Sequence, residues 1–308
     1  MSTSFRSSRL RFFVFSCFLG CFICLLAACA DETPSPRIAQ FVTLYPTTST
    51  TSTTSIAPLS LTETPDALAL YDGQWKTSQP GIEYRAARGR VISGTEQADE
   101  LLLMTRIDPK RVQLKVRYAP SATQHVRDWL ESTQADVVIN GGYFDEQNVA
   151  TALVIVDGVA TGKSYSGFGG LFALRKNGNS TTPSLQWLKT KPYRPDPNIT
   201  DALQGSPMLV YNGRSVPGIS DNGARNRRSF VAIDKQGRVL LGICQYAQWT
   251  LTDLAHYLAE ASDLQIQNAL NLDGGASTGL WLRGGPEALL TDSFEKVPMV
   301  IVGKEIGE

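Results

Sequence analysis

The sequence has few histidines and cysteines. Its 308 residues include two His, at positions 125 and 256, and five Cys. It contains no HExxH motif, no Cys/His cluster and no phosphate-binding P-loop. We therefore expect no tightly bound transition metal and predict no cofactor. Carboxylate and amide oxygens still leave open a site for a hard cation such as Ca²⁺.

A basic surface is also missing. The 29 Lys and Arg residues balance 29 Asp and Glu residues, and no run of Lys or Arg occurs. Because DNA- and RNA-binding proteins usually carry a basic patch or stripe, we predict no nucleic-acid partner. Hydrophobic residues make up 42% of the chain, enough for one large globular domain or two small ones.

The first 28 residues have the features of an export signal. Arginines at positions 6, 9 and 11 precede an apolar run from Phe12 to Ala28, which is short for a membrane span of about 20 residues. Its end, Leu26-Ala27-Ala28-Cys29, resembles a bacterial lipobox, in which the chain is cut before the cysteine and that thiol is acylated. We predict a lipoprotein signal peptide over residues 1–28. A lipidated Cys29 would anchor an exported bacterial protein at the outer face of a cell membrane.

Residues 29–66 have the composition of a linker. Ser, Thr and Pro dominate this stretch, and no apolar period is present. Such a composition cannot bury enough surface to offset chain entropy, so we predict an extended tether after the lipidated cysteine. If Cys29 is acylated, Cys244 has no cysteine left to pair with, and the exported domain has no disulfide.

Strand-like sequence dominates residues 67–308. Apolar runs rich in Val, Ile and Leu recur there, and many end in turn pairs. Asp157-Gly158 and Asn212-Gly213 favour tight hairpins and hence antiparallel pairing. The expected strands lie at 82–88, 101–107, 112–119, 136–141, 152–158, 171–175, 206–213, 229–234, 239–244 and 269–272.

Helical periodicity is confined to two segments, 121–133 and 250–262. Thr250 and Asp253 have the spacing of a capping box at the start of the second. The expected fold is therefore a single α+β domain over residues 67–308, with mixed, largely antiparallel sheets and a few flanking helices.

The stretch NALNLDGGASTG, residues 268–279, contains a formal match to the G-x-S-x-G nucleophile motif around Ser277. In an α/β-hydrolase the catalytic His follows the Ser, but both histidines of this chain precede Ser277. The acid Asp273, at the end of an apolar strand, is therefore the better candidate. Gly274 and Gly275 follow it and allow a ligand to approach the backbone closely. An ordinary Asp-Gly turn is the alternative for these residues.

A second stretch, VVINGGYFD at residues 137–145, repeats this design. An apolar strand leads to Asn140 and then to two glycines, Gly141 and Gly142. Tyr143, Phe144 and Asp145 follow, and this sequence is too apolar for a routine exposed turn. Two strand ends of matching design suggest two walls of one cleft.

A third stretch, ARNRRSF at residues 224–230, places three arginines before an apolar strand. A solvated basic loop is the simpler interpretation. An anion-binding clamp is the more specific interpretation, because guanidinium groups bind phosphate bidentately. Gly205-Ser206-Pro207, before another strand, is a further candidate for the same anionic site.

Together these stretches resemble the phosphodiester glycosidase family. The resemblance covers about residues 80–303 and departs from the family in two places: Gly274-Gly275-Ala276-Ser277 replaces Gly-Gly-Gly-Ser, and Arg228-Ser229 replaces Arg-Thr. The matching segments are VVINGGYFD (137–145), GSPMLVYNGR (205–214), RRSFVAID (227–234), WTLTDLAHYL (249–258) and NALNLDGGAST (268–278).

The resemblance implies hydrolysis of a sugar-1-phosphodiester on a surface glycan or glycoconjugate, with Asp273, Arg228 and Asn140 as the catalytic group. Arg228 would bind the phosphate, helped by the N–H groups of Gly274 and Gly275, and Asp273 would act as base or electrostatic stabiliser. Asn140 would orient substrate oxygens, Tyr143 or Phe144 would stack on the sugar, and Asp145 would be a reserve carboxylate. The remaining predicted substrate-binding residues are Gly141, Gly142, Ser206, Ser229 and Ser277.

Two other functions stay open at the level of sequence. A non-catalytic cell-envelope module that binds phosphodiester-containing polysaccharide would suit the same tether and lipid. A phosphodiesterase would break the other P–O bond of the same substrate. The sequence also gives no distance between carboxylates, so it leaves open whether the anomeric configuration is retained or inverted.

Overall fold

A computed structural model of the chain describes residues 70–93, 96–178 and 180–307. The described residues belong to one compact unit. The predicted signal peptide, Cys29 and most of the predicted tether lie outside the described residues. No helix in the described ranges is long and apolar enough to cross a membrane.

Strands make up most of the regular structure, and every strand pairing that the structure describes is antiparallel. This confirms the predicted α+β fold with largely antiparallel sheets. The strands are β1 (Lys76–Gln79), β2 (Ile82–Ser93), β3 (Glu96–Ile107), β4 (Val112–Tyr118), β5 (Val137–Asn140), β6 (Val154–Val156), β7 (Val159–Thr161), β8 (Gly170–Asn177), β9 (Ser180–Trp187), β10 (Ile199–Gly205), β11 (Met208–Tyr211), β12 (Arg214–Ser215), β13 (Arg228–Asp234), β14 (Val239–Cys244), β15 (Ile266–Asn271), β16 (Leu280–Leu282) and β17 (Met299–Glu305).

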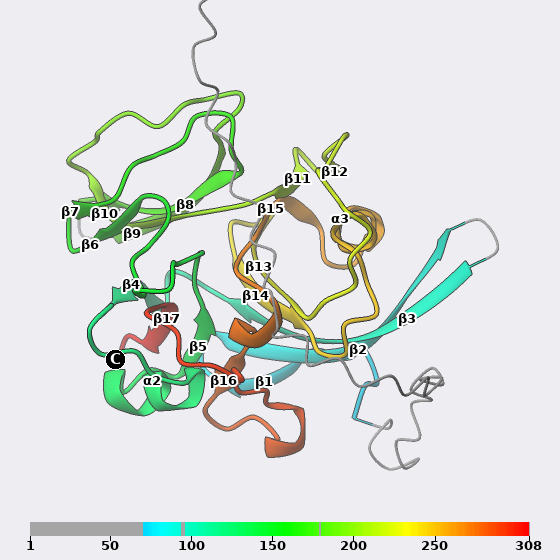
Figure 1. Ribbon diagram of the computed structural model, residues 1–308. Helices are drawn as coiled ribbons and strands as arrows, with labels where there is room; N and C mark the ends of the chain where they lie inside the picture. Colours follow the sequence, from blue (N-terminus) through cyan, green and yellow to red (C-terminus); the bar gives the residue numbers. More distant parts are fainter. Residues whose placement is uncertain (1–69, 94–95, 179, 308) are drawn as a thin grey trace, which may run out of the picture. The chain divides into compact units, whose positions relative to one another are not determined.

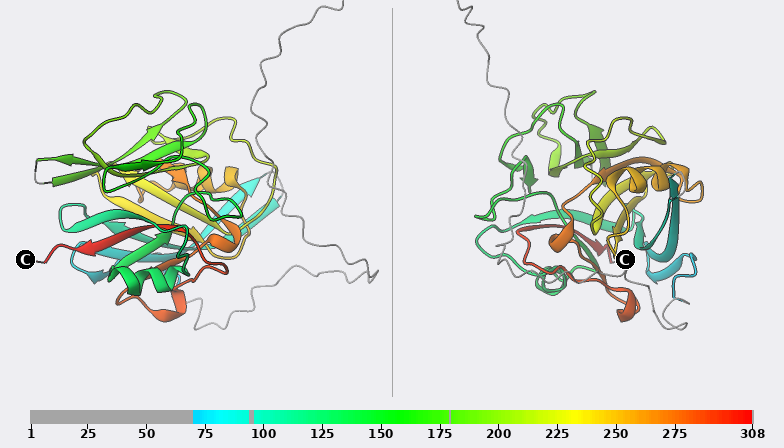
Figure 2. Two further views of the ribbon diagram at one scale, coloured as in Figure 1. Left: turned by 60° about the vertical axis from the view of Figure 1, so that its left-hand side comes forward. Right: turned by 45° about the vertical axis from the view of Figure 1, so that its right-hand side comes forward.

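The strands form three sheets. An 8-stranded sheet has the order β1-β2-β3-β14-β13-β15-β11-β12, a 5-stranded sheet the order β7-β6-β10-β8-β9, and a 4-stranded sheet the order β16-β5-β17-β4. In Figure 1 the two smaller sheets lie on one side of the 8-stranded sheet, and Figure 2 shows the same arrangement from two other directions. One apolar core joins all three, with Val231, Phe172 and Ile301 as fully buried members from the three sheets.

The two predicted hairpins are confirmed. Asp157-Gly158 connects β6 to β7, and Asn212-Gly213 connects β11 to β12. All four residues have positive φ, between 47° and 81°. Both turn residues of a type I′ hairpin need that conformation, and Asp-Gly and Asn-Gly adopt it at low cost.

Helix α3 (Leu251–Glu260) covers the other face of the 8-stranded sheet. Its predicted capping box is present: the Thr250 hydroxyl accepts from the N–H of Asp253 at 3.1 Å, and the Asp253 carboxylate accepts from the N–H of Thr250 at 3.0 Å. Leu254, Ala255 and Leu258 form its buried stripe. These residues recur at helical spacing, so one face of the helix packs on the sheet.

Helix α2 (Val126–Thr133) packs on the 4-stranded sheet and begins later than the predicted segment 121–133. Gln124 forms an isolated β-bridge with Val297, and its N–H donates to the Val297 carbonyl at 3.3 Å. An extended pairing of this kind excludes helical backbone angles, so the helix starts two residues further on.

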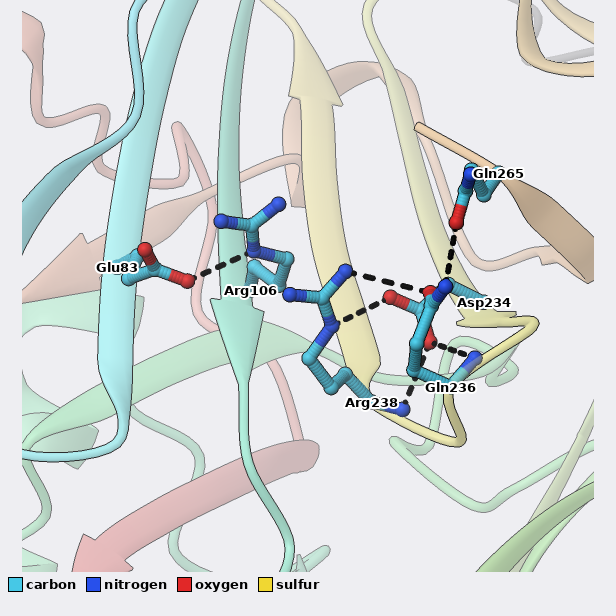
Figure 3. Close-up of polar contacts among 6 residues, drawn as sticks. All are labelled: Glu83, Arg106, Asp234, Gln236, Arg238 and Gln265. Atoms are coloured by element: carbon cyan, nitrogen blue, oxygen red, sulfur yellow. Dashed lines mark hydrogen bonds and ion pairs between the residues drawn. The ribbon is translucent and has the colours of Figure 1, made fainter. Parts of the chain in front are cut away.

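The end of β13 remote from Arg228 carries a separate polar cluster (Figure 3). Asp234 accepts from the N–H groups of Gln236 and Arg238 at 2.9 Å each, which closes the turn into β14, and it also pairs with the Arg238 guanidinium at 2.6 Å. On the neighbouring strands Arg106 pairs with Glu83 at 2.7 Å. These groups satisfy one another, so the cluster stabilises the sheet and holds the hairpin in register.

Candidate active site

The predicted site residues lie where strands from all three sheets end. Arg228 is the first residue of β13, and Asp273 follows β15 by two residues. Asn140 is the last residue of β5, and Gly205 is the last of β10. Because β13 and β15 pair antiparallel, the start of one meets the end of the other. The N–H of Asp273 donates to the carbonyl of Gly141 at 3.0 Å, so the two Gly-Gly stretches meet.

Asn140 is fully buried and connects the elements around this point. Its Nδ2 donates to the backbone carbonyl of Asp273 at 2.7 Å. Its Oδ1 accepts from the Ser229 hydroxyl at 2.7 Å and from the N–H of Gly279 at 3.2 Å. The sequence predicted that Asn140 orients substrate and that Ser229 binds it. The structure instead uses both side chains to hold the Asp273 turn against β5 and β13, because their polar atoms are already engaged with the protein.

Asp273 is half-buried, and its carboxylate accepts from the N–H of Gly274 at 2.9 Å. Burial raises the pKa of Asp273 to about 6; hydrogen bonds from Ser277 and Gly274 oppose the shift, and the negative charge of Glu295 adds to it. A carboxyl group with a pKa near neutrality is suited to acid–base or nucleophilic chemistry.

Ser277 connects Asp273 to a carboxylate that the sequence did not single out. Its buried hydroxyl is in hydrogen-bond contact with Asp273 and donates to Oε1 of Glu295 at 2.7 Å. Glu295 lies on an exposed loop before β17. No glycine or sequence motif lies beside Glu295 in the chain, so only folding brings it near Asp273.

Neither histidine is placed to act as the base for a Ser277 nucleophile. His125 lies at the start of α2, with Nδ1 at 3.0 Å from the Ser293 carbonyl, and His256 is exposed on α3.

Tyr143 is half-buried and turns its hydroxyl into the protein. The hydroxyl donates to the carbonyl of Ser206 at 2.6 Å and accepts from Nδ2 of Asn271 at 2.8 Å. Burial raises the pKa of Tyr143 well above its usual value, and Asp273 raises it further while Arg228 lowers it. Tyr143 thus lies within the electrostatic reach of both predicted catalytic groups. Its hydroxyl network fixes its ring in the wall of the site; the sugar-stacking role expected from sequence stays a prediction.

Arg228 is half-buried without an ion-pair partner in the described part of the chain. Its Nη2 donates to the carbonyl of Ala224 at 2.6 Å, and its Nε is buried with no hydrogen-bond partner. Burial lowers the pKa of Arg228, and Tyr143 and Asp221 oppose that shift from beyond ion-pair distance. A desolvated guanidinium group with an unused N–H is placed to receive an anion.

Arg227 is more deeply buried than Arg228. Its Nη2 donates to the carbonyls of Thr278 at 2.7 Å and Asp292 at 3.2 Å, while its Nη1 is buried without a partner. The exposed ring of Phe294 covers this guanidinium at 4.1 Å from the ring centroid. Arg225, the third arginine of the predicted clamp, is exposed and donates to the carbonyl of Gln248. The structure therefore divides the predicted clamp into one buried, one half-buried and one exposed arginine.

The N–H groups of Gly274 and Gly275, predicted to bind phosphate, already have partners. Gly274 donates to the Asp273 carboxylate, and Gly275 donates to the carbonyl of Arg227 at 2.9 Å. Gly275 has φ of +62°, and a Cβ built on Gly274 would lie 2.8 Å from the Arg227 carbonyl. Both glycines therefore serve the turn that presents Asp273, because a side chain at either position would strain or displace it.

Gly141 and Gly142 are needed for close packing between sheets. A Cβ on Gly141 would lie 2.5 Å from the Met299 side chain, and one on Gly142 would lie 2.8 Å from the carbonyl oxygen of Gln204. Both residues are buried. They bring β5 against β17 and β10, so their contribution to the site is the position of Tyr143.

Asp145 and Phe144 take structural positions. The Asp145 carboxylate accepts from the N–H groups of Gln147 at 3.0 Å and Val149 at 2.8 Å, which closes its own loop. Phe144 pairs with Ala150 in an isolated bridge and packs against the apolar core. Asp145 is therefore engaged in a turn, unlike the reserve carboxylate that the sequence predicted.

Potential metal ligands and surface hollows were compared with the position of the predicted site residues. Within the described ranges no group of three His, Cys, Asp or Glu side chains is arranged to hold a metal ion. Two surface hollows, of about 210 and 260 Å³, lie beside the end of α3 and between β4 and β9. None of the predicted site residues lines them, so they are separate from the Asp273 region.

A comparison with protein families shows to which family the chain belongs. The sequence profile of the phosphodiester glycosidase family matches residues 133–302, more than half of the sequence. The chain belongs to this family. The match includes all five segments on which the resemblance rested. A comparison with curated protein sequences finds no match.

Solved structures show the same fold. The catalytic domain of zebrafish N-acetylglucosamine-1-phosphodiester alpha-N-acetylglucosaminidase, auto-inhibited by its pro-peptide, superposes with a TM-score of 0.60 at 20% identity, covering 75% of this chain and 86% of that one. A hypothetical protein from Synechocystis superposes with a TM-score of 0.51 at 18% identity, covering 73% of this chain and 62% of that one. At these identities the likeness establishes the fold alone.

Proposed function

We propose that this phosphodiester glycosidase family member is a hydrolase that cleaves the bond between sugar and phosphate in a sugar-1-phosphodiester. The observation that carries the proposal is that the turn after the desolvated carboxyl group of Asp273 adjoins the start of β13, where the N–H of Gly275 donates to the Arg227 carbonyl at 2.9 Å. Arg227 there is buried and Arg228 is half-buried, and neither has an ion-pair partner among the described residues. A buried charge is stable only with a counter-charge. The phosphate of the substrate would supply that charge to Arg228.

The reaction makes demands that this arrangement can meet. The leaving group is a phosphomonoester, which departs readily because the phosphate oxygens stabilise the electron pair that it takes. The enzyme must hold the phosphate and stabilise the positive charge that develops at the anomeric carbon. Arg228 is placed for the first task and Asp273 for the second, while Asn140 and Ser229 hold Asp273 in position.

The same geometry argues against a purely binding role. A carboxylate close to the phosphate weakens the binding of an anion by charge repulsion. A binding module therefore gains nothing from Asp273, and desolvating that carboxyl group also costs stability. A glycoside hydrolase needs such a carboxylate, which favours catalysis over simple recognition.

We also propose that the substrate belongs to a surface glycan or glycoconjugate. The support is the sequence of residues 1–66, which predicts export, acylation of Cys29 and a tether. A tethered enzyme at the outer face of a membrane meets envelope polymers and secreted glycoconjugates first.

A product assay tests the proposed function. Wild type should release free sugar and a phosphomonoester from a panel of methyl phosphodiesters of hexose and N-acetylhexosamine 1-phosphates. Asp273→Asn and Arg228→Ala should each lower kcat/KM by about 100-fold or more, as expected when a charge that stabilises the transition state is removed. Arg225→Ala, an exposed arginine of the same loop, is the control and should retain activity.

Two results would contradict the proposed reaction, and a third would contradict the role assigned to Asp273. Saturable binding of the diesters without sugar release would support the binding module. Release of sugar 1-phosphate and methanol would show that the enzyme breaks the P–O bond to the methoxy group, as a phosphodiesterase does. Near-native turnover by Asp273→Asn would remove that residue from the mechanism.

A further inference from the structure

Cleavage at an anomeric carbon commonly uses two carboxyl groups with different tasks. One faces the anomeric carbon, and the other controls the proton of the attacking water. Asp273 meets the requirements of the first. The acid nearest in the motifs, Asp145, uses its carboxylate to close its own loop. The second group must therefore come from elsewhere in the fold.

Glu295 is in contact with the same serine hydroxyl as Asp273. Ser277 Oγ donates to Glu295 Oε1 at 2.7 Å and is within hydrogen-bond contact of the Asp273 carboxyl group. Because the Ser277 hydroxyl interacts with both groups, the Asp273 and Glu295 carboxyl groups lie around a single hydroxyl. Carboxyl groups are about 5–5.5 Å apart in glycosidases that retain the anomeric configuration and about 6.5–9.5 Å apart in those that invert it. The shared hydroxyl therefore favours the shorter, retaining arrangement.

The loop that carries Glu295 is fixed to the Asp273 turn. The N–H of Phe294 donates to the carbonyl of Ala276 at 2.7 Å, and Arg227 donates to the carbonyl of Asp292 at 3.2 Å. The Ser293 hydroxyl accepts from the first N–H of α2, that of Val126, at 3.2 Å. These bonds position the backbone immediately before Glu295, so its contact with Ser277 is supported by a fixed loop.

The two carboxyl groups have different environments. Asp273 is desolvated, whereas Glu295 is exposed and has no ion pair with a described residue. An exposed carboxylate has access to water. A desolvated carboxylate is poorly hydrated and is better suited to interact directly with the sugar carbon.

We propose that Glu295 is the second catalytic carboxylate and that the anomeric configuration is retained. The inference rests on the proposed function. In the first step an Asp273 oxygen bonds to the anomeric carbon, and the C–O bond to phosphate breaks with its electron pair leaving on the phosphomonoester. In the second step water attacks that carbon, Glu295 takes the water proton, and the bond to Asp273 breaks with its electrons returning to the carboxylate.

The charges around Asp273 support this division of tasks. Glu295 and Tyr143, each on a loop, interact electrostatically with Asp273. Arg228, on β13, interacts electrostatically with Tyr143. The negative charge of Glu295 raises the pKa of Asp273. Loss of that charge should therefore shift the acid limb of the pH–rate profile to lower pH.

The test uses Glu295→Gln and Glu295→Ala, with Glu287→Gln, a distant exposed acid, as the control. On the diester that wild type cleaves fastest, NMR should show that the first-formed free sugar keeps the configuration of the substrate. Glu295→Gln should release phosphomonoester in a burst equal to the enzyme concentration and then turn over about 100-fold or more slowly. Azide, which needs no general base, should restore turnover of Glu295→Ala and form a glycosyl azide of retained configuration.

The outcomes separate this inference from the proposed function. An inverted first product, or wild-type kinetics and pH profile for Glu295→Gln, overturns the inference while leaving the proposed hydrolase in place. Failure of wild type to release sugar from any diester overturns the proposed function and the inference with it.

Discussion

At the scale of a single residue, the burial of Asp273 lowers the stability of the folded protein when its carboxyl group is charged. Its carboxyl group has a folded pKa of about 6 against a reference value of 3.8, because burial disfavours the charged form. The folded state therefore binds this proton more tightly than the unfolded state. The resulting stability is fully present below about pH 4 and is lost as pH rises through about 6. At neutral pH the protein carries a desolvated charge at the proposed site.

The first prediction concerns Asp273→Asn. At pH 8 the variant should have a larger free energy of unfolding than wild type by on the order of 2 to 3 kcal/mol, because it removes the cost of the buried charge. At pH 3.5 the two proteins should differ much less, since Asp273 is then protonated. Urea denaturation at both pH values measures the difference. A difference that is the same at both pH values would show that Asp273 is not desolvated in solution.

At the scale of elements, the site depends on glycines where strands from different sheets approach one another. Gly142 follows β5 and faces the carbonyl of Gln204 in β10, with no room for a side chain. Tyr143 comes next and lies beside both Asp273 and Arg228. The packing of two sheets thereby sets the position of a site residue.

The second prediction concerns Gly142→Ala. Its Cβ would lie 2.8 Å from the Gln204 oxygen, so the strand end must move. We expect a loss of about 1–3 kcal/mol in stability, as for other overpacked interiors, together with reduced kcat/KM because Tyr143 moves. Denaturant titration and the product assay measure the two effects. Gly307→Ala, where a Cβ meets nothing within 4 Å, is the control. Wild-type activity in Gly142→Ala would show that the Tyr143 position is not critical.

At the scale of the whole molecule, three sheets share one core and meet at the Asp273 region. The described unit needs no disulfide for this, since Cys244 is buried and free. The predicted lipid anchor would act through a different part of the chain. Folding of the domain and its attachment to a membrane should therefore be separable by mutation.

The third prediction concerns that attachment. When the full chain is produced in a bacterium, it should incorporate a labelled fatty acid and sediment with membranes. Cys29→Ser should abolish both properties while leaving the activity of the purified domain unchanged. Cys24→Ser, a cysteine in the middle of the apolar run, is the matched control and should keep the lipid. Lipid labelling of Cys29→Ser would contradict the predicted acylation site.

Much of the architecture could be predicted from local sequence. Apolar runs ending in turn pairs located most strands, and Asp157-Gly158 and Asn212-Gly213 identified two hairpins. Thr250 and Asp253 identified the start of α3. These features depend on residues a few positions apart, whose side-chain periodicity and backbone preferences are properties of the local chain. Strands β10 and β17 were among those not predicted; the predicted stretch Gly205-Ser206-Pro207 begins only at the last residue of β10.

The sequence by itself determined the fold class and the family and singled out Asp273 as the candidate acid, because these depend on order and spacing along the chain. Only the tertiary structure decided the tasks of the other residues. It engaged Asn140 and Ser229 in holding the Asp273 turn, buried Arg227, and brought Glu295 to Ser277. Hydrogen bonds between strand ends and the loss of solvent around charges depend on which segments meet in space, and local patterns do not contain that information.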